Sequence, residues 1–301
     1  MSSVHKITSP EKINFKNLFI AMGLNFSITI AEIIGGLISH SLALISDALH
    51  NFSDAVALII TYLAIKLGQR PRTLKYTFGL KRAEIIAAIV NAVSLIIISF
   101  FLIKESISRL TKPSPIIGTI MLITATVGFL ANISGTFLLK KGSAHNLNLR
   151  AAYFHLLSDA FSSIVVIIGA ICIILFKIYW IDPILTILIS LYILKEAYAI
   201  VKEAVDILMM SNVSRINLEE IKEFVEKIPG VINIHHIHLW KMTDNDTHFE
   251  AHVEVEDMAV SQTAEIHKTI FDELQKRYAI NHVTLQFECQ VCEKFDILAS
   301  S

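Results

Sequence analysis

The stretch AEIIAAIVNAVSLIIISFFLIKESI, residues 83–107, decides the fold class of this chain. A helix that crosses the roughly 30 Å hydrocarbon core of a bilayer needs about 20 mostly apolar residues, and this stretch is long and apolar enough. Five further stretches have the same character, at residues 15–38, 42–68, 115–139, 151–176 and 181–201. The sequence therefore predicts six transmembrane helices.

The charges of the chain are divided unevenly along its length. Residues 1–205 hold 18 Lys and Arg against 10 Asp and Glu, a net charge of +8, whereas residues 206–301 hold 8 against 17, a net charge of −9. The formal net charge of −1 is therefore a cancellation between two parts of different character. Three cysteines are too few for a disulfide scaffold, and the composition excludes a purely soluble, a disordered and a collagen-like chain.

Basic residues indicate how the spans are oriented. They are concentrated before the first span (Lys6, Lys12, Lys16) and in the connections that contain Lys66–Arg82 and Lys140–Arg150. Because cytoplasmic loops carry the excess of Lys and Arg, both termini are expected in the cytoplasm. We expect a cytoplasmic N-terminal segment at residues 1–14, a six-span transmembrane domain at 15–205 and a cytoplasmic domain at 206–301.

The cytoplasmic domain is predicted to be a small α+β domain. Asn217 reads as the N-cap of a helix that Pro229-Gly230 terminates. Two strands around a Thr-Asp-Asn-Asp-Thr turn, a helix at about 261–278 and a strand at about 282–288 complete an α-β-β-α-β order, ferredoxin-like or metallochaperone-like, with the helices on one face of the sheet. Such a domain buries only a modest core, so we expect it to form a homodimer.

One six-residue string occurs in two of the predicted spans. His-x-x-Ser-Asp-Ala places His50 and Asp54 in the second span, and His155 and Asp159 in the fifth. Residues four apart lie on one helix face, and ionisable groups inside a membrane are costly, so each is a functional candidate. One such pair could simply form its own hydrogen bond, but two copies indicate four ligands that converge.

Two imidazoles and two carboxylates suit a divalent cation in tetrahedral coordination. This favours zinc over magnesium or calcium, which prefer six or more oxygen ligands. The absence of thiolates disfavours copper(I), whereas cobalt, iron and manganese are compatible with the same ligands.

Two further acids lie within predicted spans. Asp47 shares a helix face with His50, and either supports metal entry or forms a hydrogen bond with a neighbouring span. Glu32 lies closer to a span end, where a solvated or interfacial position is expected.

These motifs resemble those of the cation diffusion facilitator family, zinc-transporting branch. The resemblance covers nearly the whole chain and includes the basic connection with Tyr76-Thr77-Phe78-Gly79 and Arg82-Ala83-Glu84. It implies a homodimeric transporter, not an enzyme, that exports zinc, and also Co²⁺, Cd²⁺ or Fe²⁺, in exchange for protons. It assigns the transport site to His50, Asp54, His155 and Asp159, and His50 is associated with preference for zinc.

The resemblance also implies features outside the transport site. Arg82 and Asp206 are candidates for a charge interlock between the halves of the dimer. A regulatory zinc site is expected from His235, His252, His267 and Glu288. The connection between the second and third spans has no His or Asp, so an accessory metal site found there in some relatives is doubtful.

Two local patterns refine the expectations for the cytoplasmic domain. Strand alternation puts His236 and His238 on the face opposite His235. Cys289-x-x-Cys292 has metal or redox spacing, but a single pair of this kind is more often incidental.

Two other functions compete with transport. An intramembrane metalloenzyme is disfavoured because four protein ligands leave no open position and no His-Glu-x-x-His helix is present. A scaffold would not explain carboxylates in two spans. We expect a bacterial plasma (inner) membrane, lipid contact and no nucleic-acid partner.

Overall fold

The structure is a computed structural model that describes residues 15–68, 70–143, 147–212, 215–243, 246–291 and 296–298. The predicted N-terminal segment at 1–14 lies outside these residues. The described residues divide into two compact units, one made of those up to Ile59 with Asn91–Tyr198, the other of Ile60–Val90 with those from Ala199 onward. Each unit is considered by itself below.

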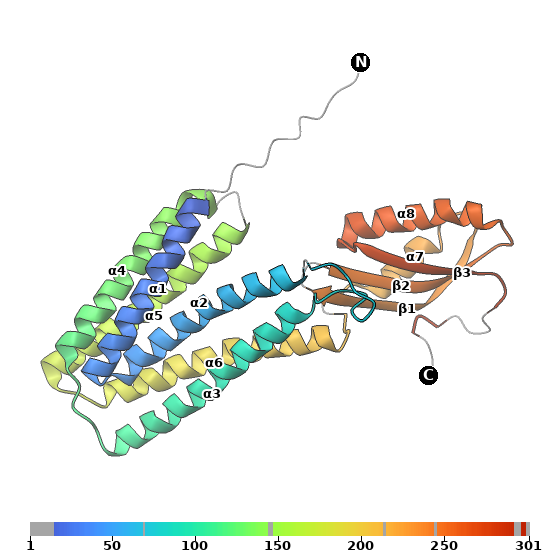
Figure 1. The fold of residues 1–301 in the computed structure, drawn as a ribbon. Coiled ribbons are helices and arrows are strands. Elements are labelled where there is room, and N and C mark those ends of the chain that lie inside the picture. The colour runs from blue at the N-terminus through green and yellow to red at the C-terminus, as the bar shows by residue number, and fades with distance from the viewer. Residues whose placement is uncertain are drawn as a thin grey trace. The chain divides into compact units, whose positions relative to one another are not determined.

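Six long helices occupy the N-terminal two thirds of the chain (Figure 1). They are α1 (Phe15–Ser39), α2 (Leu42–Gly68), α3 (Ala83–Thr111), α4 (Gly118–Ser143), α5 (Leu147–Phe176) and α6 (Ile181–Leu208). Among the described residues, four segments are long and apolar enough to cross a membrane, at Ala83–Thr111, Gly118–Lys140, Tyr153–Phe176 and Ile181–Leu208. The protein is therefore a membrane protein, and the prediction that α1 and α2 also span stays a prediction.

Small residues let α1 and α4 approach closely in the first unit. A Cβ atom built on Gly35 of α1 would lie 2.3 Å from Oγ1 of Thr124 on α4, and one built on Gly128 of α4 would lie 2.2 Å from Oε1 of Glu32 on α1. Small residues are typical of helix contacts inside membranes, where close packing replaces the hydrophobic driving force. The buried cluster that joins α2, α4 and α5 includes Leu44, Met121 and Val166.

The second unit contains a three-stranded sheet with two helices. The elements α7 (Leu218–Val225), β1 (Val231–Thr243), β2 (Asp246–Val255), α8 (Val260–Tyr278) and β3 (His282–Glu288) follow one another in the order expected from the sequence. The sheet order is β1-β2-β3, with β1 antiparallel and β3 parallel to β2. Asn217 caps α7 as predicted, because its side chain accepts a hydrogen bond from the backbone N–H of Glu219.

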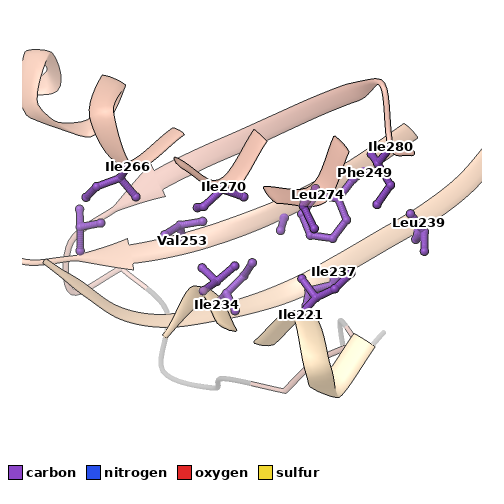
Figure 2. Packing of buried hydrophobic residues seen from close by; sticks show 13 residues of the cluster. Ile221, Ile234, Ile237, Leu239, Phe249, Val253, Ile266, Ile270, Leu274 and Ile280 are labelled. Atoms are coloured by element: carbon purple, nitrogen blue, oxygen red, sulfur yellow. The ribbon is translucent and has the colours of Figure 1, made fainter. Parts of the chain in front are cut away.

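Alternation along β2 separates an apolar face of this sheet from a polar one. Phe249 and Val253 pack against Ile221 of α7 and against Ile270 and Leu274 of α8 in one buried cluster (Figure 2). Both helices therefore cover the apolar face. The intervening residues of β2, among them His248 and His252, belong to the opposite face.

Candidate metal centre

The first predicted pair lies on one face of α2. Nε2 of His50 lies 3.7 Å from Oδ2 of Asp54, one helical turn further along. The helix continues through both residues from its start at Leu42, so its regular geometry fixes the direction of the two side chains.

The second pair lies on α5 and meets the first. Nε2 of His155 lies 3.6 Å from Oδ2 of Asp159 and 3.4 Å from Oδ2 of Asp54. The rings of His50 and His155 are 6.5 Å apart between centroids and meet edge to face. The structure thus brings all four side chains together.

The oxygen atoms that face this centre lack other partners. Oδ2 of Asp54 and Oδ2 of Asp159 are both buried and have no hydrogen-bond partner. The Asp159 side chain is 2% exposed, whereas that of His155 is 41% exposed. Buried acceptors without donors are costly, and a divalent cation between the two helices would satisfy them together.

Asp47 connects the two helices one turn before His50. It is buried, and its Oδ1 atom accepts a hydrogen bond of 2.5 Å from the hydroxyl of Ser162 on α5. The structure therefore contains the hydrogen bond to a neighbouring helix that was one of the two expectations for Asp47. Metal entry through Asp47 stays a prediction.

Asp182 at the start of α6 holds the start of α2, a role that the sequence analysis missed. Its carboxylate accepts hydrogen bonds from Ser41 Oγ at 2.5 Å, from the Leu42 N–H at 2.9 Å and from the Ala43 N–H at 3.2 Å. The first N–H groups of a helix have no partner inside the helix. A carboxylate from another helix supplies it here, and so fixes the end of α2 that leads to His50.

The expectation for Glu32 is wrong. Its side chain is fully buried, and Oε2 accepts a hydrogen bond of 3.1 Å from Nδ2 of Asn51. Glu32 also fills the space left by the missing side chain of Gly128. The distance of Glu32 from the end of its span could not predict this burial, because a glycine on another helix makes the room for the side chain.

A second group of possible ligands lies on the polar face of the sheet. Ligand atoms of His235, His236 and His252 all lie within 4.8 Å of one another. Oε1 of Glu288 lies 2.8 Å from Nε2 of His235, and Oε2 lies 3.5 Å from Nδ1 of His252. Burial lowers the pKa of His235, although Glu288 opposes this shift, and a neutral imidazole is the form that binds metal.

The predicted separation of His236 from His235 is wrong. The pairing of β1 with β2 shifts between His235 and His238, and His236 has a φ of 50°. This β-bulge interrupts the alternation of side chains. His236 therefore lies beside His235, with 4.9 Å between ring centroids.

Two other candidate ligands stand apart from this group. His267 is half-buried on α8 and stacks on Phe271, with ring centroids 6.5 Å apart. The expected role of His267 as a ligand of a regulatory zinc site stays a prediction. Cys289 is an exposed free thiol, and Cys292 lies outside the described residues.

An ion pair within the chain lies next to Arg82, one of the two predicted interlock residues. Nε and Nη2 of Arg82 are buried without a hydrogen-bond partner, and the neighbouring Lys81 forms an ion pair with Asp246 on β2. Although burial opposes it, Lys81 holds the pKa of Asp246 below 3.8. An interlock of Arg82 with Asp206 between two protomers stays a prediction, since one chain does not test it.

Comparisons with known proteins match both parts of the chain. Residues 18–209 match the family model described as the cation efflux transmembrane domain, and residues 213–290 match the cation efflux protein cytoplasmic domain. Zinc transporter ZitB of Pectobacterium atrosepticum is 38% identical over 96% of this chain and 90% of its own. The cadmium, cobalt and zinc/H(+)-K(+) antiporter of Bacillus subtilis is 35% identical over 93% and 91%. Metal cation efflux system protein CzcD of Cupriavidus metallidurans is 35% identical over 94% and 89%.

Proposed function

Because the chain belongs to the cation efflux family, we propose that it exports zinc from the cytoplasm in exchange for protons, through a site made by His50, Asp54, His155 and Asp159. Divalent metal efflux follows from the family, and the relatives are named as transporters rather than enzymes. Their printed names also support cadmium and cobalt as cargo. Iron is a further candidate cargo on ligand chemistry alone.

The observation that carries this proposal is the contact between α2 and α5. His155 of α5 lies 3.4 Å from Asp54 of α2, closer than either imidazole lies to the acid of its own helix. Two carboxylates neutralise a divalent charge, and two imidazoles complete a tetrahedral shell. Four protein ligands leave no position for a reactive water, which suits binding and release rather than catalysis.

Protons can drive release at the same four residues. An imidazole in water titrates near pH 6.5, and it binds metal only when it is unprotonated. Protons that reach the site from the outer side would therefore compete with zinc for His50 and His155. The site loads from the cytoplasm, opens outward, exchanges zinc for protons and returns protonated.

The proposed membrane arrangement has six spans, with both termini in the cytoplasm and the protein in a bacterial inner membrane. The basic connections Lys66–Arg82 and Lys140–Arg150 support this orientation. The match of residues 213–290 to a cytoplasmic domain supports the side on which the sheet lies. We also propose that the protein works as a homodimer and that zinc on His235, His252 and Glu288, with His267, regulates it.

Zinc uptake into liposomes tests the exchange. Purified protein should move zinc only while a pH gradient is present, and a proton ionophore should stop this flux. Asp159→Asn should abolish uptake, whereas Ser158→Ala, one residue earlier on α5, should retain it. Zinc flux that persists without a gradient would contradict proton exchange, and flux driven only by a potassium gradient would assign the counter-ion to K⁺.

A further inference from the structure

A second set of metal-ligating side chains lies on the polar face of the sheet, away from His235. His248 of β2 and His282 of β3 are directly paired residues in the parallel ladder. Their ring centroids are 4.4 Å apart. Asp246 lies two residues before His248 on the same strand, so alternation puts its side chain on the same face.

One potential ligand atom of Asp246 faces one potential ligand atom of His248. Oδ1 of Asp246 lies 3.5 Å from Nε2 of His248, and this nitrogen is buried and without a hydrogen-bond partner. The His248 side chain is only 5% exposed and stacks on Trp240, with 5.4 Å between ring centroids. The aromatic contact fixes the imidazole plane, while the exposed ring of His282 gives access from solvent.

The other carboxylate oxygen of Asp246 is occupied by a cation from elsewhere in the chain. Oδ2 of Asp246 accepts a hydrogen bond from the ammonium group of Lys81, which lies in the connection between α2 and α3. Phe78 of the same connection meets the ring of His248 edge to face, at 5.8 Å between centroids. Both segments belong to the same compact unit. The connection supplies no His or Asp of its own, but it contacts two of the three candidate ligands.

We propose that Asp246, His248 and His282 form a second binding site for a divalent transition metal in the cytoplasmic domain, and that Lys81 competes with the metal for Asp246. Two imidazoles and one carboxylate match the ligand preference of zinc, with a fourth position left for water. A metal held by Oδ1 of Asp246 would repel the ammonium on Oδ2 at short range. Metal binding therefore releases Lys81, and with it the connection between α2 and α3.

Cobalt quenching of Trp240 fluorescence tests the site. The full-length protein carries Trp180→Phe, which leaves Trp240 as the single tryptophan, and His235→Gln with His252→Gln, which remove the neighbouring group. Co²⁺ should quench Trp240 saturably. His282→Gln should weaken binding by at least about tenfold, because losing even a group that only orients a metal ligand typically costs that much affinity. His238→Gln, an exposed histidine on β1, is the matched control and should leave the titration unchanged.

Lys81→Gln should change the cobalt affinity in the opposite direction to His282→Gln, and it keeps all three proposed ligands. Removing one like charge should tighten cobalt binding by about tenfold, the size expected for a divalent ion and a unit charge roughly 6 Å apart in a water-like dielectric. In the parent protein, zinc should also increase amine labelling of Lys81, and His282→Gln should remove this increase. Quenching that is unaffected by His282→Gln, or an unchanged midpoint in Lys81→Gln, would overturn the proposal. If His282→Gln does not elute from size-exclusion chromatography as the parent protein does, the cobalt titration of Lys81→Gln tests the proposal instead.

Discussion

Nε2 of His155 on α5 lies 3.4 Å from Oδ2 of Asp54 on α2. The two lie 101 positions apart along the chain, yet they are closer than His50 and Asp54 on a single helix. This contact joins two copies of one motif into a single cluster of four ligand side chains. The proposed transport site therefore exists only while α2 and α5 stay packed against each other.

The Asp47–Ser162 hydrogen bond should hold that site together. Ser162→Ala removes the donor and leaves a carboxylate oxygen of the buried Asp47 without this partner. Hydrogen bonds between membrane helices contribute on the order of 1 kcal/mol, so thermal unfolding in detergent should begin at a lower temperature. Zinc affinity should fall with it, because α2 and α5 separate more easily. Ser134→Ala, which removes a hydroxyl that donates to the Leu130 carbonyl of its own helix, should change neither quantity.

The carboxylate of Asp182 should be needed to keep the start of α2 in place. Asp182→Ala leaves Ser41 and the first N–H groups of α2 without their acceptor. Loss of a helix cap costs about 0.5–2 kcal/mol, and zinc flux should fall because His50 follows on the same helix. Thr186→Val is the control, since Thr186 bonds to the backbone of Asp182 and not to its carboxylate. Wild-type flux and stability in Asp182→Ala would show that the cap is dispensable.

A side chain at Gly128 should destabilise the protein, because the fully buried Glu32 would have to move. The methyl group of Gly128→Ala would meet Oε1 of Glu32 at 2.2 Å, and overpacking costs typically 1–3 kcal/mol. The measurement is the melting temperature of the purified protein. Gly23→Ala introduces the same methyl group where nothing lies within 4 Å, so it should melt as the parent does. Equal melting of the two variants would contradict the packing of α1 on α4.

The metal-free cytoplasmic domain should lose stability in mild acid. Burial lowers the pKa of His235 and of His248 below 6.5 in the folded protein. The unfolded chain therefore binds more protons than the folded one as the pH falls below about 6.5, and folding weakens in that range. Trp240 fluorescence in Trp180→Phe, with chelator present, should report a lower melting temperature at pH 5.5 than at pH 7.5. His235→Leu should reduce this difference, and an unchanged difference would contradict the buried neutral imidazole.

Local patterns in the sequence predicted much of the fold and the four-residue centre. Apolar character and length placed α2 at the residues where the structure has it, and the repeated motif identified His50, Asp54, His155 and Asp159. These features depend on neighbours within a few residues, or on one motif that occurs twice.

Features that depend on distant parts of the chain could not be predicted. Burial of Glu32 depends on the absence of a side chain at Gly128, and the cap of α2 depends on a carboxylate 140 residues away from Leu42. The bulge that turns His236 beside His235 reverses the outcome of strand alternation, because one extra residue changes every later side-chain direction. The Lys81–Asp246 pair joins two segments that no local pattern relates.

Anomalous diffraction at the zinc absorption edge, from crystals of the zinc-loaded protein, tests the central claim most directly. We predict one zinc ion about 2.0–2.2 Å from ligand atoms of His50, Asp54, His155 and Asp159, and its loss in Asp159→Asn. Zinc peaks confined to the cytoplasmic domain, or an ion bound between α2 and α5 by other side chains, would contradict the proposed transport site.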